Sequence, residues 1–180
     1  MLYFIAILPP EPLRSKLSAQ KQLIAEQYKT YKALNSPPHI TLFPPFQKDA
    51  SQEEYFLQTL EKEMSTVQSF DITLNGHGAF PPRVVYVAVE LTDALQQLYE
   101  QIKLLVREVW EVKEERYGGR PYHPHLTLAF KDLSKGAFHK VWEVYRDTSF
   151  EATFTVCKVA LLKHDGKVWQ VLKEIGLKKE

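Results

Sequence analysis

Short apolar runs and longer amphipathic stretches alternate along this chain. The apolar runs are rich in branched and aromatic side chains, which favour β-strands. They cover residues 2–8, 39–43, 70–74, 83–91, 125–130, 150–162 and 168–172. The stretches between them predict helices over 11–29, 51–64, 92–112 and 134–146. Because strands and helices are mixed in this order, the pattern predicts an α+β protein.

Local signals indicate where several of these elements begin and end. Pro44 and Pro45 follow the second apolar run and are expected to end that strand. Ser51 is the expected N-cap of the second helix, with Glu54 as its capping-box partner. Residues 75–78, Asn-Gly-His-Gly, predict a flexible turn after the third run.

One short pattern occurs twice. Residues 39–42 read His-Ile-Thr-Leu and residues 125–128 read His-Leu-Thr-Leu, and a proline precedes each copy. On a strand, residues i and i+2 point to the same face, so each copy places a histidine beside a threonine. The residues concerned are His39 and Thr41 in the first copy and His125 and Thr127 in the second. A separation of about half the chain predicts two lobes related by a pseudo-twofold axis.

Two imidazoles and two hydroxyls in one place suit acid–base chemistry on a phosphate ester. Histidine gives and takes protons near neutral pH, so one of His39 and His125 can activate the attacking group while the other protonates the leaving oxygen. Thr41 and Thr127 would donate hydrogen bonds to the non-bridging phosphate oxygens, where charge collects in the transition state. The alternative is that all four are ordinary strand residues.

A metal site is a second alternative. His123 and His125 are two residues apart on one expected strand face and could chelate a metal ion together. Both motifs lack carboxylates and thiolates, so catalysis without a metal or other cofactor is expected. The remaining histidines are expected to be solvated: His77, His139 and His164.

The segment before the second copy predicts a loop that contacts a ligand. Arg120 could hold a phosphate, while Tyr117 and Tyr122 could stack on a base. An ordinary flexible loop with two glycines is the alternative. Arg83 and Lys131 are weaker candidates, because charges at strand ends are more often solvated.

Composition limits the remaining choices. The 180 residues suit one domain made of two interlocked lobes, and a net charge of +1 does not suggest binding to long duplex nucleic acid. The single cysteine, Cys157, excludes a disulfide within the chain and is expected in the core. The apolar N-terminus lacks a basic region and a cleavage site, and apolar runs are too short for a membrane span. We therefore expect a cytoplasmic protein.

The paired His-x-Thr-x motifs resemble those of the two-histidine (2H) phosphoesterase superfamily, which includes 2′-5′ RNA ligase-like proteins and cyclic phosphodiesterases. Residues 78–87, Gly-Ala-Phe-Pro-Pro-Arg-Val-Val-Tyr-Val, resemble the segment between the family's motifs, and residues 122–129 resemble its second motif with the usual flanks. Among smaller bacterial members, the chain is most similar to uncharacterised phosphoesterases of Gram-positive bacteria.

This resemblance implies a bilobal α+β fold in which each lobe carries an antiparallel sheet flanked by helices, with the motifs facing each other across a central cleft. It also implies metal-independent cleavage of a small phosphodiester, a nucleotide or an RNA end. It assigns catalysis to His39 and His125, and phosphate binding to Thr41 and Thr127. We expect His39 to act as general acid and His125 as general base, or the reverse. The oligomeric state is left open.

One position departs from the family pattern. Many RNA-processing relatives have an arginine two residues after the second motif's leucine, where this chain has Phe130. A specificity for RNA ends is therefore less well supported than phosphoester chemistry. A nucleotide-binding module without turnover and a 2′-5′ RNA ligase are the alternative functions.

Overall fold

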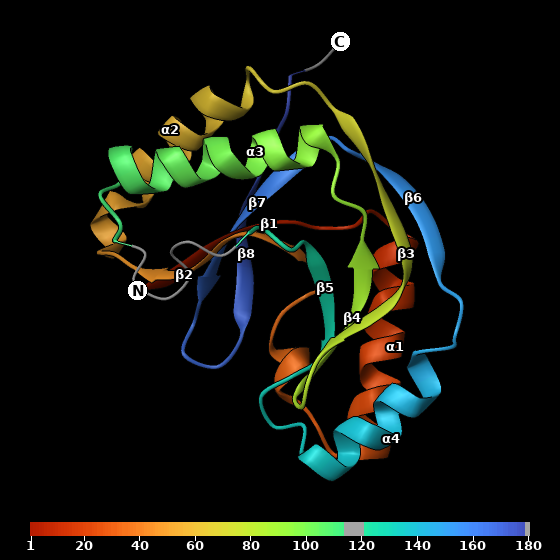
Figure 1. The fold of residues 1–180 in the computed structure, drawn as a ribbon. Helices are drawn as coiled ribbons and strands as arrows, with labels where there is room; N and C mark the ends of the chain where they lie inside the picture. Colours follow the sequence, from red (N-terminus) through yellow and green to blue (C-terminus); the bar gives the residue numbers. More distant parts are fainter. Residues whose placement is uncertain (114–120, 179–180) are drawn as a thin grey trace.

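A single curled sheet of eight strands forms the centre of the computed structural model, which describes residues 1–113 and 121–178 (Figure 1). The strand order is β6-β3-β4-β5-β2-β1-β7-β8, and neighbouring strands are antiparallel. The strands are β1 (Leu2–Ile7), β2 (Ile40–Gln47), β3 (Phe70–Phe80), β4 (Val84–Val89), β5 (His125–Ala129), β6 (Glu151–Val156), β7 (Lys158–His164) and β8 (Trp169–Gly176).

Four α-helices pack against this sheet in two pairs (Figure 1). α2 (Glu53–Met64) and α3 (Asp93–Leu104) lie at one end of the molecule, and α1 (Leu13–Tyr28) and α4 (Lys135–Tyr145) lie at the other. A π-helical segment, Leu105–Val109, continues α3. The order of strands and helices confirms the expected α+β class. No helix in the described ranges is both long and apolar enough to cross a membrane.

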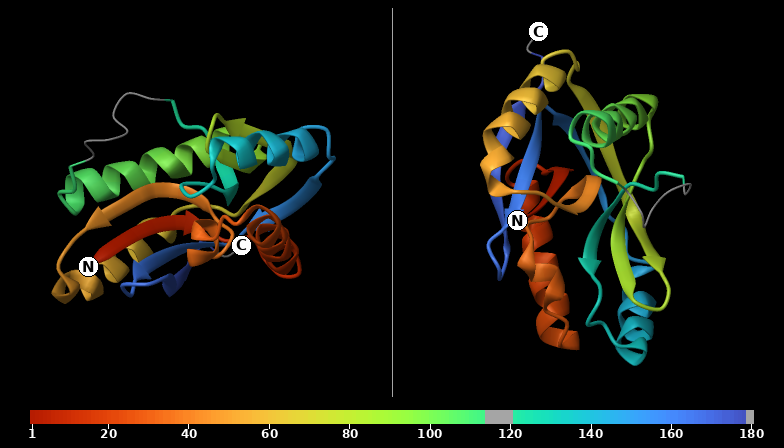
Figure 2. Two further views of the ribbon diagram at one scale, coloured as in Figure 1. Left: turned by 90° about the horizontal axis from the view of Figure 1, so that it is seen from below. Right: turned by 90° about the vertical axis from the view of Figure 1, so that its left-hand side faces the viewer.

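The sheet consists of two four-stranded halves that meet at the motif strands. β6, β3, β4 and β5 form one half, and β2, β1, β7 and β8 form the other, so the halves stand side by side in the right-hand view of Figure 2. β2 and β5 join them through a single residue pair, Ile40 opposite Leu126. Each half therefore contributes one motif strand to the seam, which agrees with the predicted pseudo-twofold arrangement.

The main core lies on one face of this sheet. Apolar side chains from all four helices pack there against Ile40 and Leu42 of β2 and Leu126 and Leu128 of β5, which are almost completely buried. Side chains alternate between faces along a strand, so the histidine and threonine of each motif point away from this core. A smaller cluster, centred on Phe4 and Leu162, covers part of the opposite face.

β2 is longer than expected, because Pro44 and Pro45 do not end it. The strand continues to Gln47 and pairs with the beginning of β1. The register shifts between Tyr3 and Ile5, so the two prolines occupy a bulge. Proline cannot donate a ladder hydrogen bond, and a bulge removes that requirement.

β3 also runs on where a turn was expected. The strand extends from Phe70 to Phe80 through the predicted turn at 75–78. Gly76 adopts a positive φ of 71°, and the register against β4 shifts between Leu74 and His77. The glycine therefore forms a bulge within a long strand, which is the other common use of glycine in such a pattern.

The long apolar run near the C-terminus is two strands. β6 and β7 are separated only by Cys157, yet β6 pairs with β3 and β7 pairs with β1, in opposite halves of the sheet. Cys157 is exposed at this crossing, so its expected burial is wrong. The expected cap at Ser51 is also wrong, because Asp49 accepts from the Ser51 backbone N–H and caps a short 3₁₀ turn before α2.

Candidate active site

The two motif strands place their polar side chains on one face of the sheet. Ile40 lies opposite Leu126, and both point into the core. Continuing this antiparallel register by one residue in each direction sets His39 opposite Thr127 and Thr41 opposite His125. The structure therefore brings together the four residues that the sequence singled out, each histidine facing the other motif's threonine.

Both histidines are held in the same way. The Nδ1 of His39 donates to the carbonyl oxygen of Pro37 at 2.7 Å, and the Nδ1 of His125 donates to that of His123 at 2.8 Å. A carbonyl can only accept, so Nδ1 carries the proton and the neutral ring leaves Nε2 as an acceptor. The two imidazoles thus present the same nitrogen to the site.

The proline before each histidine explains this shared geometry. Proline restricts the residue that precedes it to an extended conformation. Pro38 and Pro124 are both buried, which fixes the backbone on either side. The carbonyl two residues before each histidine is therefore held where the ring can reach it. The sequence shows the prolines, but their role becomes visible only in the hydrogen bonds.

Burial lowers the pKa of both imidazoles. The pKa of His39 falls to about 4, chiefly because burial disfavours the charged ring, although the bond to Pro37 acts in the opposite direction. Burial also lowers the pKa of His125 below its usual value of about 6.5. The charges of Lys21 and His125 contribute to the low pKa of His39, so the two histidines lie close enough to interact. Both rings are therefore neutral at pH 7 in the unliganded protein.

The threonine hydroxyls are available for a ligand. Thr41 and Thr127 are half-buried on the motif face. Within the described part of the chain, neither hydroxyl makes a hydrogen bond to another group. The threonines can therefore donate to an oxygen anion placed between the strands.

An aromatic cluster surrounds His125. The rings of Phe80 and Tyr86 both lie 5.1 Å from the His125 ring, measured between ring centroids. The Tyr86 hydroxyl is 3.0 Å from the Nε2 of His123. Gly78 lies opposite Tyr86 on the neighbouring strand, and a Cβ atom there would overlap the Tyr86 ring. The glycine is therefore needed for the position of Tyr86. Neither Phe80 nor Tyr86 stands out as a site residue in the sequence.

Tyr122 has a contact that the sequence did not suggest. Its hydroxyl donates to the Thr41 carbonyl oxygen at 2.9 Å, and its ring stacks on Tyr99 with centroids 3.9 Å apart. In the structure it joins the segment before β5 to the first motif strand. Tyr117 and Arg120, the other expected ligand contacts of this loop, lie outside the described residues.

The remaining candidates differ in their exposure. Arg83 and Lys131 are exposed, and Lys131 lies over the Phe130 ring. His139 is exposed as expected. Two histidines expected to be solvated are half-buried instead. His77, on β3, packs against Tyr145 of α4, and His164, at the end of β7, packs against Trp169 of β8.

The metal alternative receives no further ligands from the described residues. No group of three or more His, Cys, Asp or Glu side chains that could hold a metal ion occurs in residues 1–113 and 121–178. His123 and His125 have ring centroids 6.2 Å apart, and the Nε2 of His123 is engaged by Tyr86.

This fold and this site define a class: α+β proteins with two four-stranded half-sheets and a duplicated His-x-Thr-x strand at the seam between them. The sequence profile of the 2′-5′ RNA ligase superfamily matches residues 9–168. The chain therefore belongs to the 2′-5′ RNA ligase superfamily, as the motif resemblance implied.

Curated relatives with similar sequences carry phosphoesterase names. The protein named "Putative phosphoesterase GK0864" from Geobacillus kaustophilus is 27% identical over 85% of this chain and 83% of its own length. The one named "Putative phosphoesterase OB1230" from Oceanobacillus iheyensis is 25% identical over 98% of both chains. These relatives agree with the expected similarity to phosphoesterases of Gram-positive bacteria.

Solved structures with the same fold include TT0787 of Thermus thermophilus, with a TM-score of 0.72, 21% identity and full coverage of both chains. The structure of E. coli LigT complexed with 3′-AMP has a TM-score of 0.64 and 21% identity, and covers 98% of both chains. At this level of identity, the likeness establishes the fold.

Proposed function

We propose that this protein is a metal-independent phosphoesterase that cleaves a cyclic phosphate or an RNA-end phosphodiester. One observation carries the proposal: the two motif histidines lie on one sheet face, and each presents Nε2 because its Nδ1 is held by a backbone carbonyl. A phosphate between the motif strands would have an imidazole from each half on either side and a threonine hydroxyl from each strand.

The reaction divides between the two histidines. One neutral imidazole accepts a proton from water through Nε2, and the oxygen of that water forms a bond to phosphorus. The other, as imidazolium, donates its Nε2 proton to the leaving oxygen as the phosphorus–oxygen bond breaks. Thr41 and Thr127 donate to the non-bridging oxygens, which carry more charge in the transition state than in the substrate.

The pKa order assigns the two roles. The group that remains neutral to lower pH is the better candidate for the proton acceptor. Burial depresses the pKa of His39 to about 4, and this is the more strongly affected of the pair. We therefore assign His39 as base and His125 as acid for hydrolysis, the second of the two orders that the sequence left open. The roles exchange when the reaction runs backwards.

A nucleotide substrate fits the surroundings of His125. Phe80 is 38% exposed beside this histidine, so its ring offers a face on which a base can stack. LigT, which shares the fold, has been crystallised with 3′-AMP, NADP⁺ and ATP. Both observations support a small nucleotide as the ligand.

The test is a turnover screen with 2′,3′-cyclic nucleotides, ADP-ribose cyclic phosphate and RNA ending in a cyclic phosphate, in excess EDTA. We expect hydrolysis by the wild type, and a loss of about a hundredfold or more in His39→Ala and in His125→Ala. His139→Ala is the matched control, because this histidine is exposed on α4. Measuring thermal unfolding of all three variants checks that they fold.

Each alternative function predicts a different outcome of these experiments. Full activity in His125→Ala would refute the mechanism. Activity lost in EDTA and restored by a divalent metal would favour a metallohydrolase at His123 and His125. Joining of nicked RNA would show a ligase, and saturable binding without product would show a binding module.

A further inference from the structure

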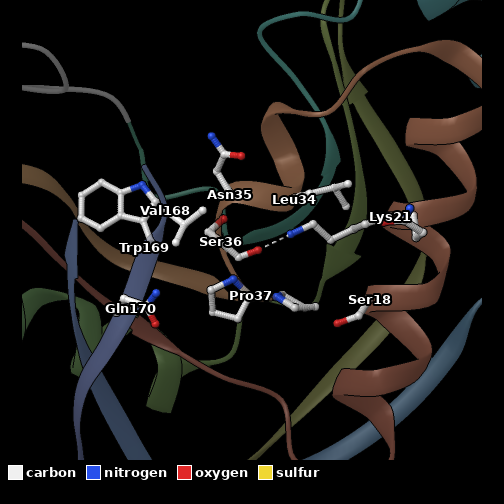
Figure 3. A pocket seen from close by; sticks show the side chains of 11 residues that line it. Ser18, Lys21, Leu34, Asn35, Ser36, Pro37, Val168, Trp169 and Gln170 are labelled. Atoms are coloured by element: carbon white, nitrogen blue, oxygen red, sulfur yellow. Dashed lines mark hydrogen bonds between the residues drawn. The ribbon is translucent and has the colours of Figure 1, made fainter. Parts of the chain in front are cut away.

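A pocket lies beside the first motif, between α1, the segment before β2 and the start of β8 (Figure 3). Its volume is about 390 Å³, which is within the range of small-molecule sites. Pro37 and Pro38 form part of its wall, and His39 follows them directly in the chain. Phe4 links His39 to another wall residue, Trp169. The centroid of the Phe4 ring is 4.8 Å from that of the His39 ring and 4.6 Å from that of the Trp169 ring. The pocket therefore adjoins His39.

Lys21 points into this region from α1 and is only 3% exposed (Figure 3). Its ammonium group donates to the Ser36 carbonyl oxygen at 2.6 Å. Ammonium has three N–H donors, and this bond uses one of them. In the part of the chain that the structure describes, no carboxylate lies within 4.0 Å of the Lys21 nitrogen. Burial lowers the Lys21 pKa to about 8, which still leaves the group mostly charged at pH 7.

The pocket wall does not neutralise this charge. None of its residues is an aspartate or a glutamate, and its other polar side chains are uncharged, including Asn35 and, across the pocket from Lys21, Trp169 and Gln170. A buried charge without a partner is costly, because the desolvation of the ion is not compensated. An anion in the pocket would supply the missing partner.

We propose that this pocket is a subsite for a second phosphate group of the substrate, one that is not cleaved. The proposal rests on the proposed function and specifies its substrate: a phosphodiester that carries a further phosphate beside the reacting one. Lys21 donates to this phosphate, and the side-chain amides of Asn35 and Gln170 provide neutral donors. Such a ligand is either a nucleotide with two phosphate groups or an oligonucleotide end, in which the neighbouring linkage supplies the second phosphate.

Binding of uncleavable product analogues tests the subsite. The probes are adenosine 3′-monophosphate, adenosine 3′,5′-bisphosphate and a dinucleotide with a 3′-terminal phosphate, measured by calorimetry at low salt. We expect the wild type to bind at least one two-phosphate probe about tenfold or more tightly than the monophosphate. Tighter binding of the bisphosphate would indicate that the second phosphate belongs to a nucleotide. Tighter binding of the dinucleotide would indicate that it belongs to an oligonucleotide. Lys21→Met should abolish the preference, and Lys140→Met, at an exposed lysine of α4, should retain it.

A second variant covers the case in which Lys21→Met does not fold. Asn35→Asp places a carboxylate of the same size in the pocket wall, so it should also remove the preference. Equal affinity of the wild type for all three probes would overturn the subsite, as would a preference that survives both Lys21→Met and Asn35→Asp. Turnover is measured separately with His39→Ala. Turnover lost in His39→Ala supports the phosphoesterase proposal even if the binding preference is absent. A binding preference that depends on Lys21 supports the subsite even if no turnover is found.

Discussion

Each motif histidine is oriented by a hydrogen bond to the backbone carbonyl two residues before it, in the segment that leads into its strand. This arrangement needs no acidic partner for the imidazole. His39 and His125 bind to Pro37 and His123 through backbone oxygen atoms, which hold the ring without adding a charge to the site. A phosphate anion therefore enters a site with a threonine hydroxyl donor on each motif strand and no carboxylate on either strand to repel it.

The pH dependence of the reaction should reflect the depressed pKa values. Turnover needs one charged and one neutral histidine, but in the free protein both pKa values lie below 6.5. The profile of kcat/KM, which reports the free protein, should therefore be a bell with its maximum below pH 6.5. A bound phosphodiester anion favours the imidazolium, so the kcat profile should lie at higher pH.

Steady-state rates between pH 4 and 9 check this prediction. The two apparent pKa values belong to the coupled pair and not to single residues. A kcat/KM maximum at pH 8 or above, with kcat showing the same profile, would contradict the neutral state of the unliganded histidines.

At the residue scale, the sequence predicts the reacting groups well, because a histidine and a threonine two apart on a strand must share a face. It does not predict what surrounds them. Phe4 and Lys21 approach His39 from parts of the chain that share no local pattern with it. Their presence follows from the pairing of β1 with β2 and from the packing of α1.

At the scale of elements, the second motif depends on the close pairing of β3 with β4. Gly78 of β3 lies opposite Tyr86 of β4, and the Tyr86 ring occupies the space that a side chain at Gly78 would need. Tyr86 in turn contacts both His123 and His125. A strand pair outside the motifs thus sets the wall of the site.

Substitution of Gly78 by alanine should displace the Tyr86 ring and so lower both turnover and stability. Overpacking of this kind typically costs about 1–3 kcal/mol of unfolding free energy. We expect Gly78→Ala to lower kcat/KM about tenfold or more while the protein remains folded, as seen by denaturant unfolding and rates on the same sample.

Gly136→Ala is the matched control for this substitution. Gly136 lies in α4 with no atom within 4 Å of an added Cβ, so alanine there should keep full activity and slightly raise stability. Unchanged kinetics in Gly78→Ala would show that the Tyr86 position does not matter to the reaction.

The sequence predicts most helices and strands to within a few residues. Two strands are longer than predicted, because a proline or glycine expected to end the strand lies in a β-bulge instead. Glycine at 76 and proline at 44 and 45 each mark a register shift inside a strand rather than the end of one. A local pattern cannot distinguish these cases, because the outcome depends on which strand pairs alongside. The division of the run 150–162 at Cys157 likewise depends on partners in opposite halves of the sheet.

At the scale of the whole molecule, Asp132 joins two segments that flank the motif strands. This residue follows β5, and its carboxylate accepts from the Thr30 hydroxyl at 2.8 Å and from the backbone N–H groups of Tyr31 and Lys32 at 2.7 and 3.1 Å. Residues 30–32 lead from α1 toward the first motif. The carboxylate therefore connects the segment after one motif strand to the segment before the other.

Neutralising this carboxylate should destabilise the protein. Partial burial opposes the charge, but the bonds from Thr30, Tyr31 and Lys32 outweigh it and hold the Asp132 pKa below its usual value. The stabilisation is therefore present above about pH 4, the pKa of an unfolded aspartate, and is lost as the pH falls through the lower folded-state pKa. Asp132→Asn should cost on the order of 1 kcal/mol at pH 7, with a smaller difference from wild type at pH 3.

Thermal unfolding of both proteins at the two pH values measures this effect. Asp147→Asn is the control, since that exposed carboxylate pairs only with its neighbour Arg146 among the described residues. A loss of stability that is equal in the two variants, or equal at both pH values, would refute a specific role for Asp132.

The order of the strands along the chain also determines when the site can exist. β1 lies between β2 and β7 in the sheet, but β3 to β6 are made before β7. During synthesis, the half-sheet that carries His39 therefore has only two of its four strands while the other half, with His125, is already complete in sequence. β7 and β8, which contribute no motif residue, supply the missing strands beside β1. A ribosome-bound chain that stops after β6 would hold all four motif residues and still lack two of the four strands in the half-sheet that carries His39.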